Sequence, residues 1–374
     1  MATLISLFGY SVPLTVILVG IALVIGLALA VMFWITIGWS TYQSVKSDRR
    51  QAVSDELQGE LLDRVFDPDV DWQSWIAGMS PTERTVLRSL LDEYLRELDG
   101  READRLRELG VALDIPARSQ KQLQRRGEYT HLNALTWLTL LERPDEYVDS
   151  AFEPRTPRER AATVRLLYES EALDDASEGL SLLLENSVSQ FTVFGQDTLY
   201  RVASDDPQAL LETAAANYQT WSQPLLIQVL TVFQYLGTSV STENLSWLTA
   251  TLEHESERVR ATAARSLGSF GWRVDIREQA FLERLVNDPA PRVRQAVYEM
   301  LASWGDEQSL RTLIDALAAE DDARARLVGT TALAKRQERI DVDISTKLGQ
   351  TWEWSREHAE YNTAARRRTD QVRG

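Results

Sequence analysis

Two stretches of the chain, 34 residues apart, repeat the same order of residue types. In each copy an acidic or proline-containing turn precedes a Val-Arg pair, which is Val259-Arg260 in one copy and Val293-Arg294 in the other. Ala and Leu then recur at helical spacing, and a glycine ends the copy. A fixed period of roughly 20–50 residues is typical of proteins in which each repeat stacks only on its neighbours, so the spacing predicts an α-solenoid.

Apolar periodicity of the helical kind extends this organisation beyond the two copies. Short breaks with Asp, Asn, Pro or Gly separate the periodic segments. No segment shows the sustained two-residue alternation of a strand. The expected helices span about 129–141 and 157–171, 176–185 and 190–203, 207–216 and 223–236, 242–252 and 258–270, 277–286 and 292–304, and 308–318 and 322–334. A last helix at about 344–367 is expected to cap the open end of the stack, so the predicted fold class is all-α.

The first 45 residues carry no charged side chain, and residues 12–39 form one apolar run. Roughly 20 apolar residues are enough to cross a bilayer, so the run predicts a single transmembrane helix at about 12–39. A cleaved signal peptide is the alternative, but it requires a basic residue before a shorter apolar run. The first basic residues, Lys46, Arg49 and Arg50, follow the helix. The positive-inside rule therefore places the N-terminus outside the cell membrane and the solenoid in the cytoplasm.

Ala22, Gly26 and Ala30 form a stripe of small residues at four-residue spacing within this run. Such a stripe allows two membrane helices to approach closely, which would make a homodimer. Ala and Gly are also common in membrane helices that do not pair, so both interpretations stay open at this point.

Between the apolar run and the repeats, residues 46–128 are expected to form a helical lead-in. Its clearest signal is Ser80-Pro81-Thr82-Glu83, in which Ser can cap a helix, Pro can occupy its first position and Glu can close a capping box. The predicted organisation is a membrane segment at 1–45, the lead-in at 46–128, the solenoid at 129–339, and a capping helix with a basic tail at 340–374.

The composition of the chain indicates the salt environment in which it folds and the classes of partner that it can bind. The formal net charge is −16, with 56 acidic against 40 basic residues, and only four of the basic residues are lysines. This balance resembles that of proteins from salt-in halophilic archaea, where molar salt screens charges to within a few ångströms; an ordinary acidic protein that uses Arg is the alternative. The negative excess argues against a nucleic-acid partner, because phosphate neutralisation dominates that affinity. The chain has no cysteine, which excludes disulfides and thiolate sites.

The two-helix units, with an acidic turn before Val-Arg and an Ala-x-x-x-Leu pattern after it, resemble HEAT repeats over 242–336. The resemblance implies a ladder in which acidic turns and arginines of the second helices bond from repeat to repeat. The corresponding arginines are Arg260, Arg294 and Arg326, and their expected partners are Glu253, Asp288 and Glu320. Thr192 stands where Arg is expected in an earlier repeat, so the ladder is expected only in the C-terminal half.

Two segments in and after the lead-in resemble the entry region of membrane-anchored prokaryotic HEAT proteins: LRELDGREADRLRELGVALDI and LNALTWLTLLERP. Proteins of that kind are often associated with membrane glycosyltransferases. The resemblance therefore implies an alternative function, an accessory subunit of a membrane enzyme such as a glycosyltransferase for cell-surface polysaccharide, although fold alone does not determine function.

The sequence carries no catalytic, cofactor-binding or metal-binding signature. The three histidines, His131, His254 and His358, form no spaced ligand set and are expected at the surface or in helix caps. The chain contains no P-loop, no GxGxxG and no GxSxG. Adjacent aspartates such as Asp174-Asp175 and Asp321-Asp322 fall at predicted turns, where helix capping explains them. The chain is therefore expected not to be an enzyme; a HEAT-like lyase or base glycosylase is the remaining alternative.

A second arginine accompanies each expected ladder residue, namely Arg258, Arg292 and Arg324. These three are expected to face outward, either simply solvated or as a basic stripe that binds an acidic partner. Stacked helix pairs create an extended face for recognition. The sequence thus favours a membrane-tethered scaffold for protein–protein interaction that needs no cofactor.

Overall fold

The structure is a computed structural model of the full chain. It describes residues 4–7, 10–13, 19, 23, 26–29, 31–34, 36, 51, 53–67, 69–185, 189–236, 245–271, 281–336 and 344–373. The chain divides into two compact units, Met1–Pro116 and Ala117–Gly374, which are described separately below as unit 1 and unit 2.

Unit 1 begins with a short antiparallel hairpin of β1 (Leu4–Leu7) and β2 (Tyr10–Pro13), in which Leu4 pairs with Pro13. The apolar run expected to be helical from about residue 12 therefore starts as a strand. Pro13 is compatible with that position, because a proline that lacks an N–H donor is tolerated on an edge strand. Beyond the hairpin, residues 19, 23, 26–29, 31–34 and 36 are helical, and the other residues of the run lie outside those described.

Among the described residues, no helix combines the length and the apolar character needed to cross a bilayer. The small-residue stripe is described only at Gly26, which is helical, with open space where a Cβ would stand. Ala22 and Ala30 lie outside the described residues.

The rest of unit 1 is a small helical bundle. After a helical segment at 53–65 come α2 (Trp72–Ala77), α3 (Pro81–Glu97) and α4 (Arg101–Ala112), and α5 (Ile115–Leu123) begins as the unit ends. The expected capping box at the start of α3 is confirmed, with Ser80 and Glu83 each bonded to the backbone of the other. Leucines on the facing sides of these helices, including Leu61, Leu87 and Leu106, are fully buried and form the core of the unit.

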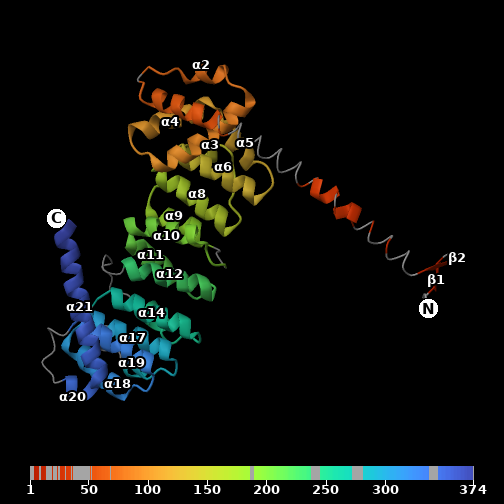
Figure 1. Ribbon diagram of the computed structural model, residues 1–374. Helices are drawn as coiled ribbons and strands as arrows, with labels where there is room; N and C mark the ends of the chain where they lie inside the picture. The colour runs from red at the N-terminus through yellow and green to blue at the C-terminus, as the bar shows by residue number, and fades with distance from the viewer. Residues whose placement is uncertain are drawn as a thin grey trace. The chain divides into compact units, whose positions relative to one another are not determined.

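Unit 2 is built from two rows of helices, and from α8 onward the chain alternates between the rows (Figure 1). The first helices of the repeats are α9 (Ala176–Leu184), α11 (Pro207–Asn217), α13 (Ser246–Thr251), α16 (Phe281–Val286), α18 (Glu307–Ala319) and α20 (Ile344–Leu348). The second helices are α6 (Glu128–Leu140), α8 (Pro157–Glu169), α10 (Val193–Asp205), α12 (Gln223–Leu236), α14 (Glu257–Ser269), α17 (Pro291–Trp304), α19 (Ala323–Ala334) and α21 (Gln350–Arg373). Each second helix packs on the next one, from α6 through to α21.

The helices expected from residue 176 to residue 334 agree with α9–α19 within a few residues, and their residues 242–244 and 277–280 lie outside those described. Two expectations need correction. The segments 129–141 and 157–171 are not one helix pair, because α6 and α8 both belong to the second row and only the short α7 (Pro144–Val148) precedes α8. The terminal segment is two helices, because Gly349 adopts a φ of 59° that breaks it between α20 and α21.

Turn chemistry sets where the helices of unit 2 begin and end. Asp175, Asp206 and Asp322 each accept a hydrogen bond from a backbone N–H in the first turn of α9, α11 and α19. The capping role expected for these aspartates is thus confirmed. Gly305 ends α17 in the left-handed conformation, with a φ of 66°, which a residue without a Cβ adopts at little cost.

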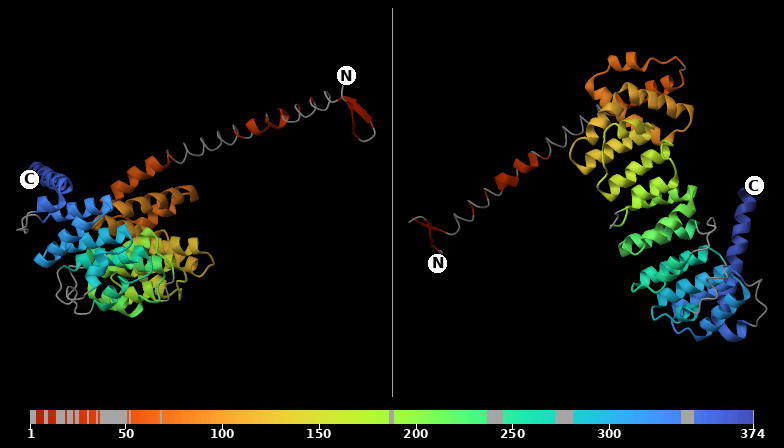
Figure 2. Two further views of the ribbon diagram at one scale, coloured as in Figure 1. Left: turned by 90° about the horizontal axis from the view of Figure 1, so that it is seen from below. Right: turned by 180° about the vertical axis from the view of Figure 1, so that it is seen from behind.

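The hydrophobic core of unit 2 runs without a break from Ala161 in α8 to Trp352 in α21. Alanines dominate the buried face of α14, where Ala261, Ala263 and Ala264 are covered by neighbouring helices. Small side chains allow the second helices to approach closely, and α21 covers the end of the row by packing on α19 (Figure 2).

Carbonyl groups near the C-terminal ends of the second helices are satisfied by the next second helix along the row. Ser269 Oγ donates to the Phe233 carbonyl at 2.7 Å, and Ser303 Oγ donates to the Gly268 carbonyl at 2.9 Å. Arg336 Nε donates to the Ala302 carbonyl at 3.1 Å. The last carbonyls of a helix have no partner within it, so these contacts both cap one helix and fix the offset of the next.

Among the described glycines of this row, Gly329 of α19 has the least room for a side chain. A Cβ at this position would lie 2.5 Å from Leu317 Cδ2 and 2.9 Å from Tyr298 Cδ2, and both side chains are buried. Gly329→Ala should therefore lower the free energy of unfolding by about 1–3 kcal/mol, because overpacking outweighs the gain in helix propensity. Gly59→Ala is the matched control, since its Cβ would meet open space; it should not destabilise the chain. Chemical denaturation of both variants checks this, and equal effects would contradict it.

Candidate interaction surface

Arg260 joins two successive repeats through both edges of its guanidinium. Nε and Nη2 donate to the carboxylate of Asp288 at 2.8 and 3.0 Å, which makes a forked pair with the turn of the next repeat. Nη1 donates to the carbonyls of His254 and Glu255, both at 2.9 Å, in the turn of its own repeat. The planar fork of Arg matches a carboxylate in this way, whereas Lys would supply only a point charge.

Arg294 repeats this geometry one repeat further on. Its Nε and Nη2 donate to Glu320 at 2.8 and 2.7 Å, and Nη1 donates to the Asp288 carbonyl at 2.7 Å. Tyr298 Oη also donates to the buried carboxylate of Glu320 at 2.7 Å. The hydrogen bonds from Arg294 lower the pKa of Glu320 most; burial opposes them, but those from Tyr298 and the Asp322 amide add to the effect and the pKa falls to about 2.

The ladder partners inferred from the resemblance need correction by one repeat. Each arginine reaches forward, so Asp288 serves Arg260 and Glu320 serves Arg294, while Glu253 pairs with Arg284 on the surface. The reason is geometric: one edge of the guanidinium is taken up by carbonyls of its own turn, and only the far edge can reach a carboxylate. Among the described residues, Arg326 bonds carbonyls only: its Nε and Nη2 donate to Leu317 and Ala318, both at 3.3 Å. The turn after α19 falls within 337–343, outside the described residues.

Upstream of α14 no forked arginine–carboxylate pair is described at the same helix position. Thr192 is the N-cap of α10 and accepts from the Gly195 amide, so it does not occupy the ladder position as the sequence had indicated. The ladder arginines are the fourth residues of their helices. In α8 the fourth residue is Arg160, whose Nη1 donates to the Glu185 carbonyl at 2.9 Å. A different pair of hydrogen bonds connects α12 to the turn before α10: the Gln228 side chain accepts from the N–H of Phe191 and donates to its carbonyl.

His131, the fourth residue of α6, occupies the ladder position of the first repeat. Nε2 lies 2.6 Å from the Arg125 carbonyl, six residues back, and Nδ1 lies 2.7 Å from Glu159 at the start of α8. Arg260 and Arg294 likewise bond the carbonyl six residues back. With a carbonyl on one side and a carboxylate on the other, both ring nitrogens have acceptors, which favours the doubly protonated, charged imidazolium.

The groups around His131 favour its charged form. Burial lowers the pKa of His131, but the hydrogen bonds to Glu159 and to the Arg125 carbonyl and the charge of Glu159 outweigh burial and the repulsion from Arg155, so the pKa is raised above 6.5. Burial raises the pKa of Glu159, whereas the hydrogen bonds from His131 and two backbone amides lower it, with a net decrease. Of the acids nearby, Glu128 is bonded by the Thr156 hydroxyl. Sequence reasoning missed this pair; the available signal is the 28-residue spacing that it shares with Arg260 and Asp288.

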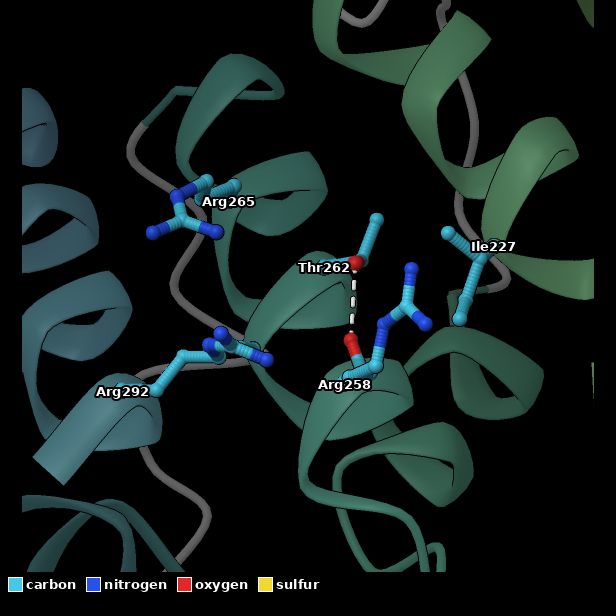
Figure 3. Close-up of a pocket in the computed structure, with 6 residues that line it drawn as sticks. Ile227, Arg258, Thr262, Arg265 and Arg292 are labelled. Carbon is cyan, nitrogen blue, oxygen red and sulfur yellow. Dashed lines mark hydrogen bonds between the residues drawn. The ribbon is translucent and has the colours of Figure 1, made fainter. Parts of the chain in front are cut away.

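The arginines expected to face outward lie on the second helices, away from the ladder. Arg258 and Arg292, together with Arg265, line an open hollow of about 380 Å³ where α12, α14 and α17 meet. Figure 3 shows Arg258 extending beside Ile227, with Arg265 and Arg292 on the side of α17. Ala261 and Thr262 are the other lining residues. Arg324 is exposed on α19 and does not line the hollow.

Two of the three arginines that line the hollow form ion pairs between α14 and α17. Arg265 pairs with Glu299 at 2.9 Å, and Arg292 lies 3.6 Å from Glu257. The guanidinium of Arg258 has no ion pair or hydrogen bond with any residue that the structure describes. Arg265 was missed by the sequence reading, although it lies seven residues after Arg258 and so on the same helix face.

Residues 245–334 match the protein family described as HEAT repeats. No curated protein sequence matches the chain significantly. The matched residues cover α13 to α19, which contain the ladder arginines and most of the residues that line the hollow. The resemblance of this part of the chain to HEAT repeats is therefore supported. HEAT repeats suggest a scaffold for protein interaction.

The carboxylate of Glu320 is expected to make the solenoid sensitive to acid. Its folded pKa of about 2 lies below the ordinary 4.5, so its contribution is fully present above pH 4.5 and is lost as the pH falls toward 2. Glu320→Gln should lower the free energy of unfolding at pH 7 by about 3 kcal/mol and flatten its pH dependence in that window. Glu307→Gln, at the exposed pair with Arg311, should change it by less than about 1 kcal/mol. Denaturant titrations from pH 2 to 7 measure both, and parallel pH profiles for wild type and Glu320→Gln would contradict the assignment.

The first repeat is expected to respond to pH in the opposite direction. Because the folded pKa of His131 is raised, its contribution is fully present below pH 6.5 and is lost as the pH rises through the folded pKa. His131→Arg installs the permanently charged residue found at Arg260 and Arg294, and it should remove this loss between pH 6 and pH 9. Hydrogen exchange of the α6 amides, with denaturant titration, measures the difference. If wild type and His131→Arg lose stability equally over that range, His131 does not carry the charge.

Proposed function

We propose that this chain is a scaffold that binds a protein partner on the face formed by its second helices. The observation that carries the proposal is the arginine hollow on α12, α14 and α17, which contains two of the three outward arginines. These arginines are separate from the ladder, whose members are already bonded to carboxylates and carbonyls. A stack of helix pairs exposes an extended face, and such faces are typical recognition surfaces of repeat proteins. We propose no enzymatic role, no cofactor and no nucleic-acid partner.

The apolar run at 12–39 supports a membrane tether as part of the same proposal. With Lys46, Arg49 and Arg50 after the run, the N-terminus would lie outside and the solenoid in the cytoplasm, close to the membrane surface. Pairing of two apolar segments through their small residues would make a homodimer. The excess of acidic residues and the scarcity of lysine support a halophilic setting, in which high salt screens the repulsion between them.

A partner near the membrane is the natural target of a tethered scaffold. The second candidate rests on the resemblance of the lead-in segments to membrane-anchored prokaryotic HEAT proteins. It is an accessory subunit of a membrane enzyme, such as a glycosyltransferase for cell-surface polysaccharide. The two candidates use the same face and differ in the identity of the protein that is held there. Identification of the captured partner therefore separates them.

The test is affinity capture of the full chain from its native membranes at high salt, with quantitative mass spectrometry of the bound proteins. The variant carries Arg258→Glu, Arg292→Glu and Arg324→Glu together, all on exposed parts of second helices. Its partner should fall at least about ten-fold in abundance, because charge reversal replaces attraction by repulsion at the interface. Thermal unfolding should change little, since none of the three belongs to the ladder and the one ion pair that is lost, Arg292–Glu257, is half-exposed at 3.6 Å.

A matched control places the same charge change on the first helices. Arg284→Glu, Arg311→Glu and Lys347→Glu also reverse three exposed cations, each paired with a surface acid. This variant should retain the partner. Loss of the partner from both triple variants would show a general electrostatic effect, and retention by both would move the interface away from the second-helix face.

A further inference from the structure

The hollow concentrates positive charge in a chain that is strongly negative overall. The net charge is −16, yet three arginines line this one opening, and no carboxylate is among the lining residues that the structure describes. Glu257 and Glu299 pair with Arg292 and Arg265 from positions that do not line the hollow. A site of this kind is complementary to an anion, and it stands out because the surrounding surface repels one.

No contact of the Arg258 guanidinium within the described part of the chain accounts for its position. It is the second residue of α14, where the exposed N–H groups give the helix N-terminus a partial positive charge. A cation in the first turn is unfavourable, the reverse of the effect of an anion there. Because its guanidinium also has no partner among the described residues, its five N–H donors remain open to a ligand.

The two neighbouring arginines of the hollow each lie beside a carboxylate of the adjacent helix. Arg265 Nε donates to Glu299 at 2.9 Å and so bridges α14 and α17, whereas Arg292 lies 3.6 Å from Glu257 in a looser, half-exposed pair. An arginine that is already oriented loses less conformational entropy on binding than a free one. The hollow therefore combines one hydrogen-bonded cation, Arg265, one loosely paired cation, Arg292, and Arg258, which has no partner among the described residues.

Apolar groups on the same row indicate what else the ligand carries. Ile227 of α12 forms one wall of the hollow beside Arg258 (Figure 3). Further along α12, Tyr235 is exposed and packs edge-to-face with Tyr200 of α10, with ring centroids 6.2 Å apart. A free phosphate would use the arginines alone. A polypeptide with acidic and apolar side chains would use both, and exposed tyrosines are favoured contacts in protein interfaces.

We propose that the hollow recognises an acidic segment of a partner polypeptide, with Arg258 bonding a carboxylate and Ile227 contacting an adjacent apolar side chain. The proposal rests on the proposed function and specifies the chemistry of the partner. The ligand is a carboxylate-bearing chain rather than a phosphate of a nucleic acid or lipid.

The experiment uses the purified full-length chain and a fluorescein-labelled peptide in which Glu alternates with Leu and Tyr, read by fluorescence anisotropy. The same peptide with Gln in place of Glu is the matched probe, and inorganic phosphate is the competitor. The acidic peptide should bind at least about ten-fold more tightly than the amide peptide, because forked Arg–carboxylate bonds need the ionised acid. Phosphate should displace it only at concentrations that ionic strength alone explains.

Three variants locate the binding. Arg258→Glu should weaken binding about ten-fold or more, and Arg258→Lys should weaken it several-fold, since it keeps the charge and loses the fork. Arg324→Glu changes the same residue type at the same helix position outside the hollow, and should stay within about two-fold of wild type. Arg258→Glu should not lower the melting temperature, because an acidic residue in the first turn of α14 favours the helix.

Equal binding of the acidic and amide peptides would overturn the proposal, as would equal losses in Arg258→Glu and Arg324→Glu. Displacement by phosphate at constant ionic strength would show a simple anion site. Sedimentation velocity without peptide would reveal a second copy of the chain as the occupant if Arg258→Glu abolished self-association. If the peptide fails while the second-helix triple variant still loses its captured partner, the scaffold proposal stands and only the ligand chemistry is wrong. If the peptide binds while that partner is retained, the acidic-ligand site stands and the scaffold proposal fails.

Discussion

A forked arginine that bonds backward to its own turn and forward to the next turn sets the register of the C-terminal repeats of unit 2. Hydrophobic burial supplies most of the stability of a solenoid, but it is non-directional and would allow neighbouring repeats to slide. Arg260 and Arg294 prevent this by spanning the joint with hydrogen bonds of defined geometry. Carbonyls at the far end of the second helices are bonded by Ser269, Ser303 and Arg336 of the following helices. The joints from α14 to α17 and from α17 to α19 are therefore fixed at both ends of the second helix, and the alanines between these ends can pack closely.

Local sequence signals predicted the helices well because each is decided by residues that are neighbours in the chain. The turn residues Asp206, Gly305 and Asp322 each act within a few residues, and all of them mark helix boundaries as expected. The break at Gly349 was not foreseen, because glycine interrupts a helix only when its φ becomes positive, and the sequence does not state φ. At the N-terminus, the strand at Tyr10–Pro13 depends on pairing with Leu4–Leu7, and the apolar composition of the run obscured it.

Contacts between repeats were harder to derive, since the sequence shows which residues can bond but not which neighbour they reach. Glu253, Asp288 and Glu320 were correctly seen as turn acids, yet each choice of partner was displaced by one repeat. His131 escaped notice because the ladder was sought through arginine, although an imidazole with two acceptors can bridge the same gap at one end of the stack. Arg265 was overlooked for a similar reason: the repeat drew attention to the Arg-Val-Arg pattern, and the hollow forms only where three helices meet.

The Arg-Val-Arg pattern itself explains how one short segment serves both structure and recognition. Residues two apart on a helix point about 200° from one another, so Arg258 and Arg260 cannot face the same way. Val259 between them is fully buried, which directs Arg260 to the turn and leaves Arg258 on the outer face of the second helix. The ladder arginine is constrained by its partners, whereas the outer one is free to change without loss of register. A solenoid built in this way can alter the chemistry that its second-helix face presents, repeat by repeat, while the joints that hold the stack together stay the same.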